Sequence, residues 1–369
     1  MARLFIGLMS GTSLDGVDAV VTDLSSPNAP QCLGHAHQPY PDELKQALLD
    51  LHTSGPDELH RSQQVGLELA RVYAQVTLEV MRPLGLAPQD ITALGAHGQT
   101  VRHCPTLKGG VGYSVQLNQP ALLAELTGID VVADLRSRDI AAGGQGAPLV
   151  PAFHQALWGD PNHATAALNL GGIANLSLMA PGQPLIGFDC GPANMLMDAW
   201  IQDQRGLAFD AHGDWARSGD CHPGLLASLM SEPYFQRPAP KSTGRDLFHL
   251  DWLRGHLRAH PGLDPADVQA TLLELTARTC TEALQRHMAS PVALIVCGGG
   301  ALNQALMGRL QELAPCRVMS SEERGLHPAQ VEAVAFAWLA QRCVDALPGN
   351  EASVTGALGP RILGALYRA

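Results

Sequence analysis

Two short turns in this sequence combine glycine with side chains that donate hydrogen bonds or bind a cation. The first, SGTSLDGVD at residues 10–18, places two glycines, hydroxyl side chains and two aspartates between apolar runs. The second, NLGGIAN at residues 169–175, repeats the arrangement with asparagines in place of the acids. Glycine allows a close backbone approach, and several N–H groups in one turn can surround a phosphate. Both turns are therefore interpreted as phosphate-binding turns.

Each turn supplies a set of candidate ligand-binding residues. The carboxylates of the first turn suit a magnesium ion and its water ligands better than a bare phosphate. The first set comprises Gly11, Thr12, Ser13, Leu14, Asp15, Gly16, Val17 and Asp18. The second set comprises Asn169, Gly171, Gly172 and Asn175. Ordinary hairpin turns use the same residue types, so either turn taken alone also has that simpler interpretation.

A third glycine turn changes the balance between these interpretations. In ALIVCGGGALNQ, residues 293–304, a strand pattern ends at Gly298, Gly299 and Gly300, and a helical pattern follows. The chain contains no G-x-x-x-x-G-K-[ST] sequence, and no G-x-G-x-x-G sequence opens a helix. Glycine turns at equivalent strand ends in both halves of the chain favour a nucleotide site that is neither a P-loop nor a dinucleotide fold.

Short strands and helices must position these turns. Residues 3–9 and 17–24 show strand patterns around the first turn, and residues 164–180 read as strand, turn and strand around the second. This repetition predicts a duplicated α/β architecture. Further strands are expected within residues 90–103 and 128–136, strand–turn–helix units at 185–202 and 293–314, and helices at 42–84 and 327–344.

The chain is long enough for two packed units, because it has 369 residues and 46% of them are hydrophobic. A glycine- and proline-rich loop at residues 137–151 marks the expected boundary and hinge. We therefore predict an N-terminal domain at residues 1–140 and a C-terminal domain at 141–369, whose final segment could pack back on the first.

The net charge and the cysteine content limit the classes of partner and the cellular compartment that are expected. The formal net charge is −11 and no basic run occurs, which argues against nucleic acid and against an anionic membrane surface as partners. The eight cysteines are scattered without C-x-x-C spacing, and the sequence shows neither a signal peptide nor a long apolar run. These features predict a soluble cytoplasmic protein with reduced thiols.

Several segments, in order from residue 6 to about residue 360, resemble the bacterial anhydro-N-acetylmuramic acid kinases of the sugar kinase, Hsp70 and actin superfamily. The segments are GLMSGTSLDGVD, GAHGQT, AAGGQGAPLVPAFH, LNLGGIAN, FDCGPANMLMDAW, PKSTGRDLF and VEAVAFAWLA. The resemblance implies a two-domain actin-like ATPase fold of the ribonuclease H-like class, with the nucleotide in the interdomain cleft. It also implies that residues 298–300 lie against the adenosine. The chain departs from the family pattern at Cys190, Ala193 and His327.

The activity implied by the resemblance is ATP-dependent. Members of this family open the 1,6-anhydro bridge of the amino sugar with water and phosphorylate the freed 6-oxygen, giving N-acetylmuramic acid 6-phosphate in peptidoglycan recycling. Mg²⁺ arrives with the ATP, and no protein-only metal site is expected. The family also implies a homodimer, although no interface stripe can be read here. Another sugar kinase of the superfamily and a non-catalytic ATP-binding sensor remain as alternatives.

Three charged side chains are candidates for the reaction and for binding the sugar. Asp189, at a strand end before CGP, is expected to take a proton from water as general base, with helix capping as the alternative. The resemblance assigns Glu332 to sugar contact, whereas a glutamate there also suits the helix dipole. Arg136 could pair with the lactyl carboxylate or lie at the surface. His97 and His103 are expected to pack or to form hydrogen bonds, and residues 241–246 receive no role.

Overall fold

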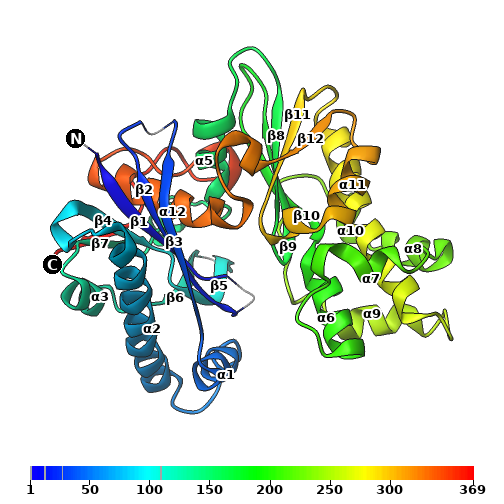
Figure 1. The fold of residues 1–369 in the computed structure, drawn as a ribbon, viewed down its shortest axis with the longest axis horizontal. Helices are drawn as coiled ribbons and strands as arrows, with labels where there is room; N and C mark the ends of the chain where they lie inside the picture. The colour runs from blue at the N-terminus through cyan, green and yellow to red at the C-terminus, as the bar shows by residue number, and fades with distance from the viewer. Residues whose placement is uncertain (1, 12–13, 27, 109) are drawn as a thin grey trace. The chain divides into compact units, whose positions relative to one another are not determined.

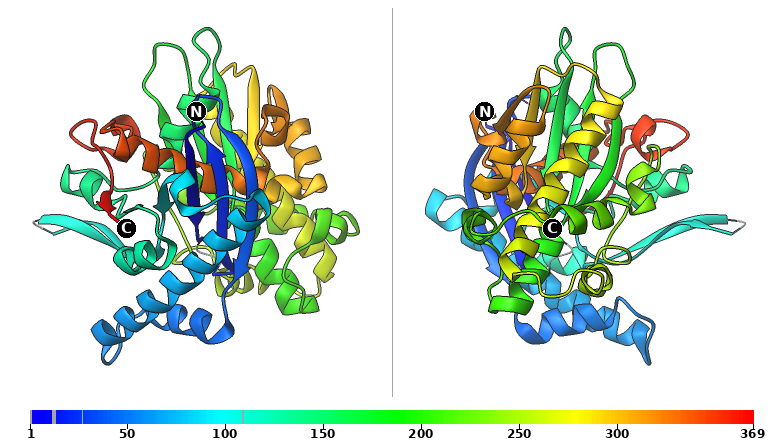
Figure 2. Two further views of the ribbon diagram at one scale, coloured as in Figure 1. Left: turned by 60° about the vertical axis from the view of Figure 1, so that its left-hand side comes forward. Right: turned by 90° about the vertical axis from the view of Figure 1, so that its right-hand side faces the viewer.

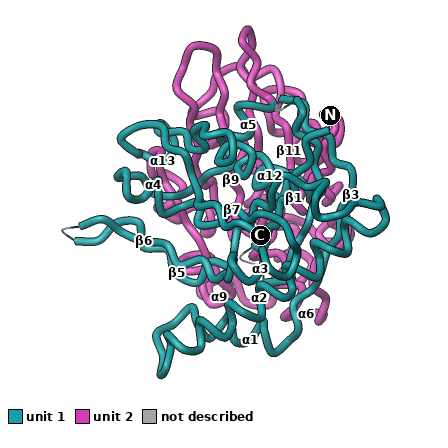
Figure 3. Tube along the Cα trace, turned by 90° about the vertical axis from the view of Figure 1, so that its left-hand side faces the viewer, with its two compact units in different colours: residues 1–157, 330–369 teal, residues 158–329 magenta. Residues whose placement is uncertain are grey.

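The computed structural model describes residues 2–11, 14–26, 28–108 and 110–369, and it separates the chain into two compact units (Figure 3). Unit 1 contains residues 1–157 and 330–369, and unit 2 contains residues 158–329. The division therefore falls after residue 157, not near residue 140, and the final segment belongs to unit 1. The reason lies in the glycine-rich loop, where Gly146 N–H donates to Asp139 Oδ2 (2.8 Å) and Gln145 N–H donates to the Thr355 carbonyl (2.8 Å).

Unit 1 is built on a six-stranded sheet with the strand order β13-β7-β4-β1-β2-β3 (Figure 1). Strand β2 runs antiparallel to both β1 and β3. Strand β4 runs parallel to both β1 and β7, and β13 is antiparallel to β7. The strands are β1 Leu4–Met9, β2 Gly16–Asp23, β3 Gln31–Pro39, β4 Ile91–Ala96, β7 Val131–Ala133 and β13 Ala365–Tyr367. The predicted strands around the first turn are confirmed.

The helices of unit 1 include a long helix, α2, and a buried helix, α12. The predicted helical stretch at 42–84 is two helices, α1 and α2, because Gly55 and Pro56 interrupt it. The elements are α1 Asp42–Asp50, α2 Glu58–Met81, η1 Arg82–Leu84, η2 Pro88–Asp90, α3 Pro120–Thr127, α4 Ser137–Ala141, α5 Val150–Trp158, α12 Val331–Val344 and α13 Ala352–Thr355. Pro328 lies in the turn η7 Pro328–Gln330 that precedes α12.

Helix α12 contacts the sheet backbone directly at two glycines. A Cβ atom added to Gly7 of β1 would lie 1.7 Å from the Ala333 carbonyl oxygen, and one added to Gly95 of β4 would lie 2.0 Å from the Phe336 carbonyl oxygen. No larger side chain fits at either position without moving the helix backbone. This close packing fixes the position of Glu332, which precedes Ala333 in the first turn of α12.

A separate two-stranded ribbon in unit 1 was not foreseen from the sequence. It consists of β5 Gln99–Leu107 and β6 Gly110–Leu117. The strand expected within residues 90–103 is β4, and the segment after its glycine-containing turn is the start of β5. Figure 2 shows the ribbon extending away from the rest of its unit.

Unit 2 repeats the strand order of unit 1, which confirms the duplicated architecture. Its five-stranded sheet has the order β10-β9-β8-β11-β12, an antiparallel meander followed by parallel strands. The strands are β8 Thr165–Leu170, β9 Ile173–Met179, β10 Ile186–Pro192, β11 Ala293–Cys297 and β12 Arg317–Ser320. Pro192, expected in the first turn of a helix, instead ends β10, and α6 begins at Asn194.

The longest helix of unit 2, α10, also went unrecognised in the sequence. The helical elements are α6 Asn194–Arg205, η3 Ala211–Gly213, α7 Asp214–Arg217, α8 Pro223–Met230, η4 Pro233–Gln236, α9 Leu250–Leu257, α10 Pro265–His287, η5 Gly299–Leu302, α11 Gln304–Leu313 and η6 Ser321–Arg324. None of the helices in the part of the chain that the structure describes is both long and apolar enough to cross a membrane.

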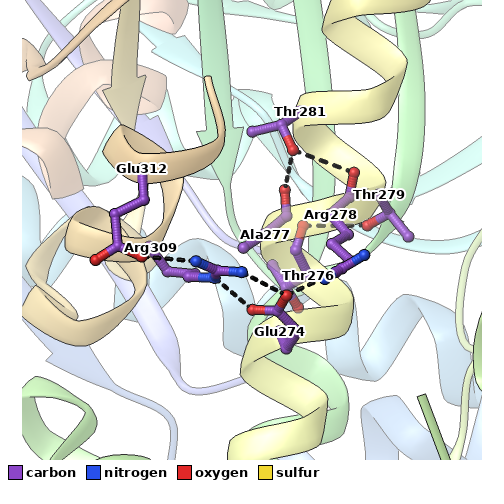
Figure 4. Close-up of polar contacts among 8 residues, drawn as sticks. All are labelled: Glu274, Thr276, Ala277, Arg278, Thr279, Thr281, Arg309 and Glu312. Carbon is purple, nitrogen blue, oxygen red and sulfur yellow. Dashed lines mark hydrogen bonds and ion pairs between the residues drawn. The ribbon is translucent and has the colours of Figure 1, made fainter. Parts of the chain in front are cut away.

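An ion-pair network joins α10 to α11, the helix that follows the third glycine turn (Figure 4). The buried carboxylate of Glu274 accepts two hydrogen bonds from Arg309, at 2.6 and 2.9 Å, and one from Arg278 at 2.6 Å. Arg309 also contacts Glu312 at 2.6 Å. Hydrogen bonding to Arg309 lowers the pKa of Glu274, so the carboxylate stays ionised and holds the two helices together.

The close packing at Gly7 predicts that one added methyl group there strongly lowers the stability of the protein. We expect Gly7→Ala to lower the free energy of unfolding by more than about 3 kcal/mol, because the obstacle is helix backbone and not a movable side chain. Gly308→Ala on α11 is the control, since no atom lies within 4 Å of its added Cβ, and it should stabilise the chain by roughly 0.5–1 kcal/mol. Urea unfolding of the two variants tests this, and a Gly7→Ala variant as stable as the wild type would refute the packing.

Candidate active site

The second predicted turn lies against the start of α6. Gly171 and Gly172 join β8 to β9, and their carbonyl groups accept hydrogen bonds from the first amides of the helix segment. Ala193 N–H donates to Gly172 O (2.9 Å) and Asn194 N–H donates to Gly171 O (3.0 Å). The turn is therefore anchored through its carbonyl groups.

The third turn packs on the end of the strand that leads into the second. Gly298 has a φ of +80°, and a Cβ atom there would lie 2.5 Å from Asn169 Oδ1. A Cβ atom on Gly300 would lie 2.6 Å from the Leu170 Cβ. Only glycine allows both the left-handed backbone and this approach. The structure thus brings together two of the three predicted turns within unit 2.

Strand register aligns a row of polar side chains beside these turns. Asn169 of β8 pairs with Asn175 of β9, and Asn175 pairs with Asp189 of β10. Cys297 of β11 pairs with Asn169 on the other side, and its thiol approaches Asn169 Oδ1 at 3.7 Å. Directly paired residues project from the same face of a sheet. The expected base and two expected nucleotide-binding asparagines therefore share one face.

Asp189 is held by a segment to which the sequence analysis assigned no role. Its carboxylate oxygen Oδ2 accepts a hydrogen bond from the Thr243 N–H at 3.0 Å, and its own N–H donates to the Lys241 carbonyl at 3.1 Å. The Tyr234 hydroxyl donates to the Asp189 carbonyl at 2.8 Å. The first α6 residue is preceded by Ala193, and no side chain caps the helix. Asp189 consequently does not act as a helix cap.

The side chains of Lys241 and Thr243 lie in the segment that contacts the Asp189 carboxylate. Lys241 Nζ donates to the carbonyl groups of Tyr234 and Phe235 at 3.2 Å each and lies over the Tyr234 ring. The Thr243 side-chain oxygen is buried and has no hydrogen-bond partner within the described part of the chain. A polar KST sequence in a loop gave no signal that it would fold onto Asp189.

Burial raises the pKa of Asp189 to about 6, against the opposing effects of the Thr243 N–H and the Lys241 ammonium group. The carboxylate is thus ionised at neutral pH and is a stronger base than an exposed aspartate. Such a group, half-buried at the end of a strand, can remove a proton from a bound water molecule.

The first turn lies in unit 1. Some of its residues could face a ligand only through backbone groups, and others could also use their side chains. Thr12 and Ser13 lie outside the described residues. Leu14 and Val17 are buried, so only their backbone groups can face a ligand, and Gly11 O accepts a hydrogen bond from Gln99 Nε2 at 3.1 Å. The backbone of β3 packs closely against Gly16, because a Cβ atom added there would lie 2.3 Å from the Gln38 carbonyl oxygen.

The two carboxylates of the first turn differ in their surroundings. Asp15 is exposed at the turn, beside Leu14, whose φ is +57°. Asp18 lies on β2, where its Oδ1 contacts His35 Nε2 at 2.8 Å and His37 Nδ1 at 3.2 Å. Asp15 and Asp18 both stay candidates for an ion that accompanies a phosphate. Across the described residues, no group of three or more His, Cys, Asp and Glu side chains is arranged to hold a metal ion by itself.

Arg136 is part of a partly buried chain of polar contacts that starts at the first turn. Its Nη2 contacts His97 Nε2 at 2.8 Å, and His97 Nδ1 contacts the Ser10 carbonyl at 3.0 Å. Burial lowers the pKa of His97 to about 3, so the ring is neutral and donates from Nδ1 to Ser10. His97 also stacks at 4.7 Å on Phe336 of α12. Both expected roles of His97, packing and hydrogen bonding, are confirmed.

Glu332 and Arg136, the two expected sugar-binding residues, lie within electrostatic reach of each other in unit 1. Burial lowers the pKa of Arg136 to about 10, while the negative charges of Glu332 and Asp139 partly offset this effect. Arg136 Nη1 also donates to the Gly146 carbonyl at 2.7 Å. Arg136 is therefore a half-buried, oriented guanidinium and not a plain surface arginine.

Comparison with known proteins places the chain in a family. A family model described as anhydro-N-acetylmuramic acid kinase matches residues 3–369. A relative of that name from Variovorax paradoxus is 54% identical over 373 residues, covering 100% of this chain and 99% of its own. Another from Cupriavidus pinatubonensis is 52% identical over 98% of each chain. Among solved structures, a ROK family glucokinase from Streptomyces griseus in complex with glucose and AMPPNP covers 92% of this chain and 99% of its own, with 15% identity and a TM-score of 0.42.

The surroundings of Asp189 predict a measurable titration. Carbon-13 NMR of carboxyl-labelled aspartate, with Asp189→Asn for assignment, should show the Asp189 carboxyl titrating with a pKa near 6. Lys241→Met should raise this pKa, because removal of a nearby positive charge disfavours the carboxylate. Lys45→Met, at an exposed site on α1, changes the net charge equally and should leave it unchanged. An Asp189 pKa indifferent to the Lys241 substitution would contradict the assigned environment.

Proposed function

The chain belongs to the anhydro-N-acetylmuramic acid kinase family, and on that premise we propose that Asp189 is the base that activates water in its reaction. The chain is an ATP-dependent carbohydrate kinase. It opens 1,6-anhydro-N-acetylmuramic acid with water and phosphorylates the 6-oxygen to give N-acetylmuramic acid 6-phosphate in cell-wall recycling. The observation that carries the proposal for Asp189 is its half-buried carboxylate, oriented by the Thr243 N–H and given a raised pKa.

The reaction balances with one protein base. Water attacks the anomeric carbon and loses a proton to Asp189, while the bond from that carbon to the bridging oxygen breaks. The bridging oxygen remains on carbon 6 and takes the γ-phosphoryl group, and ADP leaves. Phosphoryl transfer itself depends mainly on positioning and on stabilising charge. The work that needs a basic side chain is therefore the activation of water, as in glycoside hydrolysis.

The nucleotide contacts are assigned from the glycine turns. In unit 2, the backbone of Gly171 and Gly172 would bind phosphate, and residues 298–300 would lie against the adenosine. The packing of Gly298 on Asn169 supports this, because it keeps the two turns close together. In unit 1, residues 11–18 would form the other phosphate-binding set, of which residues 12 and 13 lie outside the described part of the chain. Mg²⁺ would enter with ATP near Asp15 and reduce the negative charge of the phosphates.

The sugar contacts are assigned to unit 1. Arg136 would pair with the lactyl carboxylate, since a guanidinium has five N–H donors and its contacts with Gly146 and His97 do not exhaust them. Glu332 would contact the sugar from the first turn of α12. Both are held firmly, Arg136 by its hydrogen bonds and Glu332 by the packing of Gly7 against Ala333.

We also propose that the protein is a cytoplasmic homodimer. The eight cysteines, all within the described ranges, are free thiols, which supports a reducing compartment. The dimer rests on the family resemblance. The interdomain placement of the nucleotide, the absence of a nucleic-acid partner and the cytoplasmic location stay predictions.

Loss of the base should stop turnover without stopping nucleotide binding. We expect Asp189→Asn to lower kcat with 1,6-anhydro-N-acetylmuramic acid by about 10²–10⁴-fold, the usual contribution of a general base. The dissociation constant for ADP should stay within about twofold, because Asp189 is not among the assigned nucleotide contacts. A coupled ADP-release assay and calorimetry measure the two quantities.

A matched substitution and a second substrate complete this experiment. Asp203→Asn removes a carboxylate of the same unit that pairs with Arg254, and its kcat should match that of the wild type. An Asp189→Asn enzyme with more than a tenth of wild-type turnover would refute the assignment. ADP release from the wild type with N-acetylmuramic acid but not with the anhydro-sugar would instead indicate an ordinary sugar kinase.

A further inference from the structure

Asn194, the first residue of α6, lies between the second and third glycine turns. Its Nδ2 donates to the Leu170 carbonyl at 3.0 Å, just before the second turn, and its N–H donates to Gly171 O at 3.0 Å. Its Oδ1 faces the third turn, because a Cβ atom added to Gly300 would lie 3.0 Å from it. One side chain therefore bonds to the second turn and lies beside the third.

The segment that carries Asn194 is rigidly connected to the strand that bears Asp189. Asn194 follows the last residues of β10, and the Thr276 hydroxyl of α10 donates to the carbonyl groups of Pro192 at 3.1 Å and Ala193 at 3.3 Å. Ala193 N–H is bound by Gly172 O. A shift of Asn194 would thus move the second turn with the start of α6.

An asparagine at this position adds little to the stability of helix α6. Asparagine is a weak helix former, and its side chain is more useful where it binds backbone groups outside the helix. The α6 N-cap residue is Ala193, without a side-chain cap. The contacts of Asn194 are directed to the turns instead.

We propose that Asn194 is a positioning residue for ATP, whose side-chain amide fixes the separation of the phosphate-binding turn at Gly171 and Gly172 from the adenosine-binding turn at residues 298–300. The inference rests on the proposed function, which assigns the nucleotide to these turns. In this proposal the nucleotide is bound through backbone groups, which a mutation cannot remove. A side chain can still act on binding by setting the distance between the two turns that carry these groups.

The experiment measures ADP binding directly by calorimetry. Asn194→Ala should raise the ADP dissociation constant at least tenfold, because the turns lose the bridge that sets their spacing. Asn194→Asp keeps the shape but replaces the donor with a negative charge beside the Leu170 carbonyl, so it should weaken binding further. The KM for the anhydro-sugar should stay within about twofold, since the assigned sugar contacts lie elsewhere.

A purely structural role gives a different result. His249→Ala removes the N-cap of α9, whose ring accepts the Trp252 N–H, and reports the loss of stability from a helix-start contact in the same unit. If Asn194→Ala lowers Tm like His249→Ala but binds ADP within twofold of the wild type, the inference is wrong. It is also wrong if the ADP dissociation constant and the sugar KM rise together. Failure of the proposed function would appear separately, as wild-type protein that binds ADP but forms no 6-phosphate from the anhydro-sugar.

Discussion

The register of β8, β9 and β10 is the constraint on which the candidate active site depends. Because the side-chain repeat of a strand is two residues, a shift of one residue between neighbouring strands would turn every side chain to the opposite face. The observed register places Asn169, Asn175 and Asp189 in one row. Leu168, Leu176 and Phe188, which precede or follow these residues, are buried in the core of unit 2. The same apolar packing that stabilises the sheet therefore fixes the direction of the Asp189 carboxylate.

The placement of Asp189 has a cost in stability. Its pKa rises from an ordinary value of 3.8 to about 6, which corresponds to about 3 kcal/mol against the ionised folded state. This penalty is complete above pH 6, shrinks as the folded state takes up a proton below pH 6, and vanishes below the unfolded value. The Thr243 N–H and the Lys241 ammonium group reduce it. A base of useful strength is thus obtained at the expense of folding free energy, a common property of active sites.

Much of this arrangement could be predicted from local sequence, and the failures have physical reasons. The strands beside the first two turns were predictable, because alternating apolar runs end at glycines, and their recurrence indicated the duplicated sheet. The contacts of residues 241–243 with Asp189 were not predictable, because they join a loop to a strand some fifty residues away. The unit boundary was misplaced because Gly146 bonds to Asp139, so a glycine-rich loop that suggested a linker is ordered within unit 1. The link from Ser10 through His97 to Arg136 likewise depends on tertiary packing.

The pH dependence of kcat/KM for 1,6-anhydro-N-acetylmuramic acid tests most directly whether Asp189, held in this register, is the base. The reaction needs the ionised carboxylate, so the rate should fall about tenfold per pH unit below pH 6. The midpoint of this fall should move to higher pH in Lys241→Met, by the same amount as the NMR titration of Asp189. A midpoint near 4, or one that ignores the loss of Lys241, would contradict the account.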